Sequence, residues 1–388
     1  MSGWHLFGKQ LGAGSPSRPA PRSSGILAFG LAIGLALAFI PGEVQAAGGG
    51  NWASPLFRVR VAPKVVVSGL SPAAIKAAYN FPTSSSAGAG KTVAIVDAYN
   101  DPSAASDLAV FSRQFGLPAC TTSNGCFAKV SQTGSKSRLP QTNSGWALEI
   151  SLDVQWAHAI APGAKILLVE ANSANAADLM AAEDYAGRHA QYVSNSWGGG
   201  EFSSEASYDS HFTASGVSYF VAAGDAGLPG EWPSVSPDVI SVGGTTLHFD
   251  ASGNFSSETG WSAGGGGCSQ YEPASSAQAA FAGYPAANCA GARATPDVAA
   301  DADPNSGVAV YDSTRYAGMA GWWIVGGTSV SSPLFAARSA DAGSVVNSAY
   351  VYGSSIAFRD ITVGNNGAPC LAGYDLCSGL GAWTGTTP

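Results

Sequence analysis

The hydrophobic positions change their period repeatedly from Leu70 onward, alternating between short apolar runs and stretches with helical spacing. Helical spacing is present near 102–115, over 145–162, within 175–189 and over 204–215. The short runs predict strands: TVAIVDAY (92–99), KILLVEA (165–171), YVSNSW (192–197), VSYFVAAG (217–224) and VISVGGTTL (239–247). Because these runs lack polar alternation, we expect helices on both faces of their sheet. The repeated strand–helix–strand order predicts a doubly wound, mostly parallel α/β fold, with residues 250–295 as irregular loops.

The predicted helix over 145–162, GWALEISLDVQWAHAIAP, holds two acidic residues among mostly apolar neighbours. Glu149 and Asp153 lie on one side of this helix, because a helix turns by about 100° per residue. A polar stripe lies roughly opposite and is interpreted as the solvent-exposed face: Ser151, Gln155 and His158. The two carboxyl groups are therefore predicted to point inward. Burial of two like charges then requires a shared proton or a compensating group.

Polar or glycine-rich residues stand at the ends of three predicted strands. They are Asp97, NSWGGG (195–200) and AAGDAG (222–227), and the last of these contains Asp225. In a doubly wound sheet, sites form at the carboxyl ends of the strands. We therefore expect the functional site at this edge of the sheet.

A serine-rich segment, GGTSVSSP (326–333), stands between the strand-like GWWIV and the helical LFAARSA. Serine at a helix N-terminus is a common capping residue, and it is also a nucleophile whose developing charge the backbone N–H groups stabilise. The segment holds three candidate serines, so one can cap the helix while another acts as the nucleophile: Ser329, Ser331 and Ser332.

A serine nucleophile needs a base, and histidine is the usual one. No HGT-like segment follows Asp97. None of the histidines lies in a recognisable catalytic motif: His5, His158, His189, His211 and His248. The inward carboxyl groups supply the alternative. Glu149 is predicted to act as the base toward Ser329, while Asp153 orients Glu149 and shares its proton.

The composition of the 388-residue chain favours a sizeable core, since 46% of the residues are hydrophobic and only 11% are charged. The net charge of −8 and the lack of a dense Lys/Arg run argue against a nucleic-acid partner. Without a CxxC motif or a nearby histidine at ligand spacing, the cysteines predict disulfides in an oxidising compartment rather than a metal site. The simplest of the possible pairings is local: Cys120–Cys126, Cys268–Cys289 and Cys370–Cys377.

The N-terminal region predicts export. Residues 25–40, GILAFGLAIGLALAFI, are uncharged and apolar, and PGEVQA follows them and ends at Ala46. Because a membrane span needs about 20 residues, we interpret residues 1–46 as a secretory signal peptide, with an uncleaved anchor as the alternative. Residues 47–69 are then a linker or a residual propeptide. We expect a secreted protein, without membrane contact once the signal is removed.

Several segments, in their order along the chain, together resemble the sedolisins, the serine-carboxyl peptidases with a subtilisin-like fold: GWALEISLDVQWAHAIAPGAKILLVEA, SNSWGG, VAAGDAG, PDVAADADP, GGTSVSSP and FRDIT…AGYDLCSGLG. The resemblance runs from about Leu70 to Trp383 and implies a single peptidase domain over 70–388. It implies that Glu149 and Asp153 are the catalytic carboxylates and that Ser329 is the nucleophile. The expected activity is that of a serine-type endopeptidase acting on proteins or peptides, and the protein is expected to be monomeric.

The same resemblance assigns Asp225 to the oxyanion hole, together with the backbone N–H of Ser329. It implies that Trp197, Gly198 and Gly199 line the cleft and pair with the substrate backbone. A carboxyl group stabilises an oxyanion only when it is protonated, whereas Glu149 must be able to accept a proton. Carboxyl groups have ordinary pKa values near 4, so these states coexist most readily in acid. The sequence therefore predicts an acidic optimum and a rate that declines toward neutrality.

The C-terminal region carries a candidate calcium site. The loop between Asp360 and Asp375 is rich in Gly and Asn, and Ca²⁺ prefers oxygen ligands. The resemblance implies one ion, held by the side chains of Asp360 and Asp375 and by the carbonyls of Ile361, Leu371 and Gly373. Leu371 stands where the family usually has glycine. The alternative is a pair of turn aspartates on a loop closed by Cys370–Cys377.

Two features depart from the family pattern. The N-terminal segment before Leu70 is much shorter than a sedolisin prosegment, and the stretch from Pro333 to Asp360 is shorter than usual. Two other functions therefore stay open. One is a catalytically inactive, secreted binding protein with a peptidase fold, and the other is a subtilisin-type Ser/His/Asp hydrolase that uses Asp97.

Overall fold

The computed structural model describes residues 40–41, 53–60, 66–353 and 356–384. Apart from the short strand β1 (Ile40–Pro41), the predicted signal peptide lies outside the described residues. Within the described ranges, no helix combines the length and the apolar character needed to cross a membrane.

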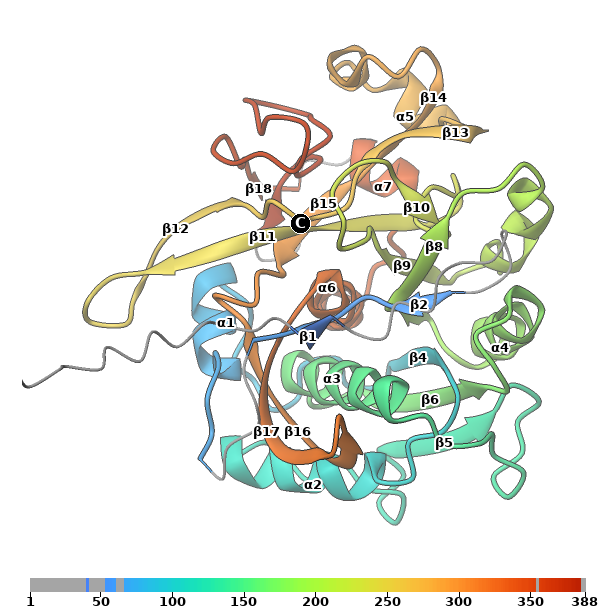
Figure 1. The fold of residues 1–388 in the computed structure, drawn as a ribbon, viewed down its shortest axis with the longest axis vertical. Coiled ribbons are helices and arrows are strands. Elements are labelled where there is room, and N and C mark those ends of the chain that lie inside the picture. Colours follow the sequence, from blue (N-terminus) through green and yellow to red (C-terminus); the bar gives the residue numbers. More distant parts are fainter. Residues whose placement is uncertain (1–39, 42–52, 61–65, 354–355, 385–388) are drawn as a thin grey trace, which may run out of the picture. The chain divides into compact units, whose positions relative to one another are not determined.

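An eight-stranded sheet carries the fold (Figure 1). Its order is β12-β11-β9-β7-β4-β6-β5, with β15 also paired to β11, and only the β11–β12 pairing is antiparallel. The strands are β4 (Thr92–Ala98), β5 (Phe127–Ser131), β6 (Lys165–Ala171), β7 (Tyr192–Asn195), β9 (Ser218–Ala222), β11 (Ile240–Phe249), β12 (Phe255–Gly260) and β15 (Val298–Asp301). The predicted mostly parallel sheet is confirmed.

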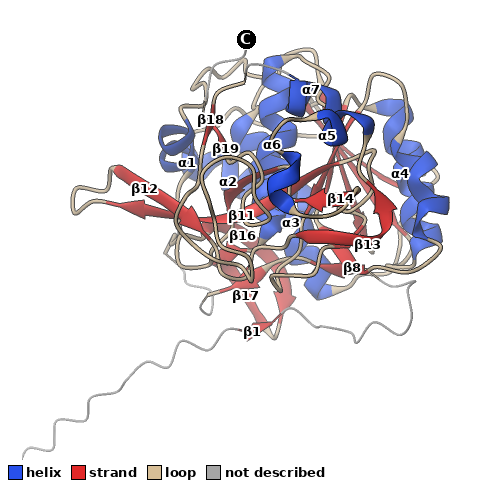
Figure 2. Ribbon diagram, turned by 90° about the horizontal axis from the view of Figure 1, so that it is seen from above, coloured by secondary structure: helices blue, strands red, loops and turns tan. Residues whose placement is uncertain are grey.

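Helices cover both faces of the sheet, as Figures 1 and 2 show. Alternate residues of β4 belong to two different hydrophobic cores, because successive side chains of a strand point to opposite faces. Val93 and Ile95 pack in the core that includes α1 (Pro72–Tyr79), α2 (Ala104–Phe115), α3 (Ser144–Ile160) and α6 (Thr328–Ala342). Ala94 and Val96 pack in the core that includes α4 (Ala176–His189) and the 3₁₀ helix η1 (Glu205–Phe212). The fold is doubly wound, as predicted.

Helix α3 is buried on all sides, so the predicted solvent-exposed stripe is wrong: Ser151, Gln155 and His158 are all buried. The hairpin of β16 (Val308–Tyr316) and β17 (Met319–Gly326) covers the side that carries Gln155. There the Gln155 amide donates to the Tyr311 carbonyl at 2.6 Å and accepts from the Tyr311 N–H at 3.0 Å. His158 Nε2 lies 2.9 Å from the carbonyl oxygen of Pro118. Gln155 and His158 thus bond to backbone groups, and the Ser151 hydroxyl donates to the Asp101 carboxylate at 3.3 Å.

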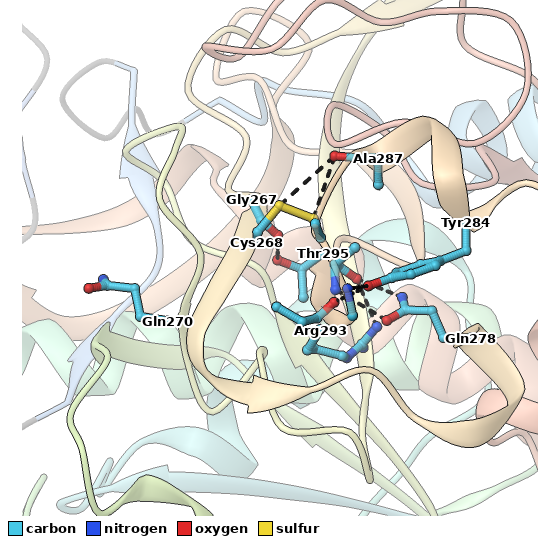
Figure 3. Close-up of a disulfide and its surroundings, with 12 residues drawn as sticks. Gly267, Cys268, Gln270, Gln278, Tyr284, Ala287, Arg293 and Thr295 are labelled. Atoms are coloured by element: carbon cyan, nitrogen blue, oxygen red, sulfur yellow. Dashed lines mark hydrogen bonds between the residues drawn. A yellow bond between two sulfur atoms is a disulfide. The ribbon is translucent and has the colours of Figure 1, made fainter.

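The region predicted as irregular, 250–295, is in fact largely ordered. Besides β12 it forms β13 (Gly267–Pro273), α5 (Ser276–Ala280), the 3₁₀ helix η2 (Tyr284–Ala287) and β14 (Ala292–Thr295). The Cys268–Cys289 disulfide joins this region, and the Gln278 amide pairs with both backbone groups of Ala294 (Figure 3). Glycine and serine in this stretch suggest loops, but cross-strand bonds and the disulfide hold it. All three predicted local disulfides are confirmed.

Smaller sheets surround the edge of the main sheet. The antiparallel group β10-β8-β2 consists of β2 (Ser54–Pro55), β8 (Trp197–Gly200) and β10 (Glu231–Trp232). Strand β3 (Arg58–Val59) joins β1, β16 and β17. The remaining elements are α7 (Ser348–Gly353), β18 (Phe358–Arg359) and β19 (Ala382–Trp383). Part of the predicted 47–69 linker is thus strand, since β2 and β3 both lie within it.

Candidate active site

Ser329 lies in the first turn of α6, directly after β17. The turn needs glycine at the N-cap, because Gly327 has a φ of 102° and a Cβ there would lie 2.7 Å from Asp225 Oδ2. Ser329 is completely buried, and its hydroxyl donates to the Ser196 carbonyl at 3.4 Å. The hydroxyl of Ser331 donates to the Thr328 carbonyl, and that of Ser332 to the Phe220 carbonyl. Of these serines, Ser329 is the one whose hydroxyl interacts with the Glu149 carboxyl.

Glu149 and Asp153 project inward from α3, as predicted, and both are fully buried. Neither carboxyl group has a hydrogen-bond partner of ordinary geometry. Burial raises the pKa of Glu149 well above its ordinary value, and the charges of Asp153 and Asp97 raise it further. The Ser329 hydroxyl interacts with the Glu149 carboxyl and opposes this rise in pKa. Burial also raises the pKa of Asp153, so the pair holds protons well above the usual range for carboxyl groups.

Asp97 extends this acidic cluster. It is completely buried at the carboxyl end of β4, and neither oxygen has a hydrogen-bond partner. Burial raises its pKa, and the charges of Asp153, Glu170 and Glu183 add to the rise. Sequence reasoning treated Asp97 only as a possible partner of a histidine and missed its place beside Asp153. Its position at a strand end was the available signal.

The four histidines of the described ranges all bond away from the acidic cluster. A ring nitrogen of His158 contacts the Pro118 carbonyl, and one of His189 contacts the Tyr185 carbonyl. His211 contacts the Asp184 carboxylate, and His248 contacts the Thr259 hydroxyl. The groups that raise the pKa of Asp97 are carboxyl groups rather than an imidazole. The geometry therefore favours the carboxyl pair over a histidine as the base.

Asp225 lies on the loop after β9 and is only 4% exposed. Its Oδ1 accepts hydrogen bonds from the Thr328 N–H at 2.8 Å and from the Thr328 hydroxyl at 3.0 Å, whereas Oδ2 has no hydrogen-bond partner. Burial raises the pKa of Asp225 to about 6, against the opposing effects of the Thr328 bonds and the Arg58 charge. Below that pH the group carries a proton, and Oδ2, which lies 3.7 Å from Arg58 Nε without a hydrogen bond, is the oxygen placed to donate it.

The strand predicted to pair with substrate, β8, lies between β10 and β2. The Trp197 side chain is completely buried and donates to the Val96 carbonyl at 2.9 Å, so it anchors the strand. At Gly198 a Cβ would lie 3.0 Å from Glu231 Oε2, which keeps this wall of the cleft narrow. Gly199 pairs with Trp232. Beyond Asp225 lies a cavity of about 490 Å³, lined by Arg58, Asp225, Trp261, Ser262, Ala263, Asp303, Pro304 and Asn305.

In the C-terminal loop, the two aspartates that were predicted to bind calcium both accept hydrogen bonds from the segment 371–373. Asp360 Oδ2 accepts from the Gly373 N–H at 2.8 Å, and Asp375 Oδ2 accepts from the Leu371 N–H at 2.6 Å. Ile361 is buried against the Cys370–Cys377 disulfide. The donor set of carboxylates and carbonyls is the chemistry that Ca²⁺ requires, so these residues fit such an ion.

Comparisons with known proteins identify the family of this chain. Residues 140–359 match the model of the subtilase family. The chain is 32% identical to kumamolisin of Bacillus sp. (strain MN-32) over 356 residues, which are 80% of this chain and 61% of kumamolisin. It is 32% identical to sedolisin of Pseudomonas sp. (strain 101) over 202 residues, which are 43% of this chain and 32% of sedolisin. The chain thus spans less than two thirds of the length of these relatives.

A solved structure supports the same assignment. Pseudomonas sedolisin, described as a serine-carboxyl proteinase and solved with two molecules of pseudo-iodotyrostatin, superposes with a TM-score of 0.69 and 27% sequence identity. The superposition covers 82% of this chain and 96% of the sedolisin chain. The subtilisin-like fold is therefore confirmed. The chain belongs to the subtilase family and, within it, to the sedolisins.

Proposed function

We propose that this protein is a serine-carboxyl peptidase that hydrolyses peptide bonds of proteins in acid. One observation carries the proposal. The buried carboxyl group of Glu149, whose pKa is raised, and not a histidine, interacts with the hydroxyl of Ser329. A base must be within reach of the proton that it abstracts, and Glu149 meets that condition.

In the proposed reaction, Ser329 Oγ attacks the carbonyl carbon of the substrate and Glu149 takes the hydroxyl proton. Asp153 holds Glu149 in place and shares its proton, because two carboxyl groups this close do not both ionise readily. Glu149 then returns the proton to the leaving amine. Water hydrolyses the acyl-enzyme in the same way, with Glu149 as the base.

The negative charge that develops on the substrate oxygen needs donors fixed in advance. The Ser329 N–H and the protonated Asp225 carboxyl are the proposed pair. Because the pKa of Asp225 is about 6, the donor is present in acid and is lost as the pH rises toward neutrality. This loss supports an enzyme that works in acid.

The test is digestion of a denatured protein from about pH 2 to about pH 8, with the cleavage sites mapped. The wild type should cut it in acid, and Ser329→Ala should not cut it at any pH. An active-site serine probe or a peptide aldehyde should label the wild type alone. A profile that rises through neutral pH would contradict the proposal, and a folded protein that neither cuts nor labels would be the inactive binding protein.

We also propose that the C-terminal loop holds one Ca²⁺ and that the protein is secreted. Asp360 and Asp375 would supply carboxylates, and Ile361, Leu371 and Gly373 carbonyls. Bound Ca²⁺ would stabilise the loop between Asp360 and Asp375. Secretion is supported by the three disulfides, which persist in oxidising compartments.

Removing calcium is expected to lower the thermal unfolding midpoint by several degrees. Saturation at a hundred times the Kd contributes about 2.7 kcal/mol, which is lost with the ion. The measurement is a melting curve with chelator, then with added Ca²⁺ or Mg²⁺. Asp360→Asn should reduce the response to Ca²⁺, whereas Asp250→Asn, on another exposed turn, should keep it. If the chelator leaves the thermal unfolding midpoint of the wild type unchanged, the proposed calcium site is refuted.

A further inference from the structure

We infer that Asp101, Asp107 and Asp312 form a binding site for a hard divalent cation, Ca²⁺ or Mg²⁺. This site is separate from the loop between Asp360 and Asp375, and the proposed reaction does not use it. A cation bound there would join segments that are far apart in the sequence.

The three aspartates meet where β16 packs against α2. Asp101 lies on the turn between β4 and α2, Asp107 lies in the first turn of α2, and Asp312 lies on β16. Figure 1 shows β16 beside α2. One carboxylate oxygen of each aspartate lies within 4.8 Å of the corresponding oxygens of the other two. Like charges at such distances repel strongly when they are buried, so a cation or protons must accompany them.

Asp312 offers an open ligand position. Its side chain is completely buried, and its Oδ1 accepts a hydrogen bond from the Thr314 N–H at 2.9 Å. Its Oδ2 has no hydrogen-bond partner. Buried polar atoms nearly always have a partner in native proteins, and an ion supplies one where no donor does. The charges of Asp101 and Asp107 both act on Asp312, so its carboxyl group lies among theirs.

The cluster carries more negative charge than Lys129 balances. Lys129 Nζ donates to the backbone carbonyl of Asp101 at 2.6 Å, but it also lies 3.5 Å from the Glu170 carboxylate. Its positive charge is therefore shared with a fourth acidic residue. Burial raises the pKa of Asp312 to about 8, and the charges of Asp101 and Asp107 add to the rise. A divalent cation among the three carboxylates would replace this repulsion by attraction.

Backbone N–H groups hold the other two carboxylates in place. Asp101 Oδ1 accepts from the Ser103 N–H at 2.8 Å, and Asp107 Oδ2 accepts from the Ser313 N–H at 2.7 Å. Such bonds favour the charged form of a carboxyl group. The candidate ligands are all oxygen atoms, which suit Ca²⁺ or Mg²⁺ better than Zn²⁺. Ser313 is exposed, so the site lies just below the surface, where an ion can enter.

A bound cation would link the β16–β17 hairpin to the helices that it covers. Asp312 belongs to the hairpin, and Asp107 belongs to α2. The hydroxyl of Ser151, on α3, donates to Asp101 Oδ2 at 3.3 Å. We therefore expect a structural ion that stabilises the packing around α3, and its removal should lower the thermal unfolding midpoint.

The test is calorimetric titration of the metal-free full chain with Ca²⁺ and, separately, with Mg²⁺, at about pH 7.5, where carboxylate ligands are free to bind. The Asp360→Asn variant serves as the parent, because it lacks a proposed ligand of the C-terminal loop. The parent should bind one ion, and the cation that binds more tightly identifies the natural class. Adding Asp312→Asn should weaken binding at least about tenfold, since even groups behind the ligands change metal affinity by that factor.

Asp107→Asn gives a second ligand substitution if Asp312→Asn does not fold, and melting curves check the folding of each variant. Asp178→Asn is the matched control, because Asp178 is likewise an acidic residue in the first turn of a helix, α4. This control should bind the ion like the parent. An affinity that survives both ligand substitutions would overturn the inference. A parent that binds neither cation would also overturn it, and would mean that the three aspartates only share protons.

Discussion

Replacing Glu149 with Gln is expected to lower kcat for peptide hydrolysis roughly 10⁴-fold, because the neutral amide cannot take the proton of Ser329. The substitution conserves size at a fully buried position, so it removes the base without opening a cavity. KM should change little, since Glu149 acts on the nucleophile and not on the bound substrate. The measurement is kcat and KM on a soluble peptide in acid, with folding checked by a melting curve.

Glu205→Gln is the matched control. Glu205 is also completely buried, and burial raises its pKa to about 8, but it lies on η1 and does not act on Glu149, Asp153 or Asp97. Its substitution should change kcat less than about threefold. Equal losses in both variants would mean that the effect is general to buried acids. Full activity in Glu149→Gln, with loss in a histidine variant, would restore the subtilisin-type mechanism.

Replacing Asp225 with Asn is expected to move the alkaline limb of the pH–rate profile upward. Burial raises the pKa of Asp225 to about 6, so the protonated, donating form falls about tenfold for each pH unit above that value. An asparagine keeps the oxygen that accepts from Thr328 and places an N–H₂ donor near Oδ2 at every pH. At about pH 8 the variant should therefore exceed the wild type, while the limb set by Glu149 and Asp153 stays in place.

Asp225→Ala separates this effect from a general loss of the loop. It lacks a donor at any pH, so its rate should fall by roughly 10²–10³ in acid, with no gain toward neutrality. An Asn variant whose profile superposes on that of the wild type would exclude Asp225 as the titrating donor.

The sheet and the disulfides were predictable because their signals are local. Unbroken apolar runs such as 92–99 and 165–171 mark strands covered on both faces, and cysteines six to seven residues apart pair readily. That Glu149 and Asp153 share one side of their helix was predictable too, since four residues bring two side chains to the same side of a helix.

Other features of the site depend on segments distant in sequence. The exposed stripe predicted on α3 is wrong because the β16–β17 hairpin, more than a hundred residues away, covers it and offers the Tyr311 backbone to Gln155. Asp97 joins the cluster only because β4 ends beside α3. Nothing within 53–60 predicts that this segment reaches the candidate active site, since the bonds that hold Leu56 come from Ser196 and Ser329.

The sequence alone determined the fold class, the disulfide pairs and the residue types of the candidate site, because periodicity and spacing act over a few turns or strands. The tertiary structure decided which polar side chains are buried away from water and which of them face one another. Those two conditions raise the pKa values of Glu149, Asp153 and Asp225, and they place the Leu56 carbonyl at Ser329, because burial and long-range contacts arise only when distant segments pack.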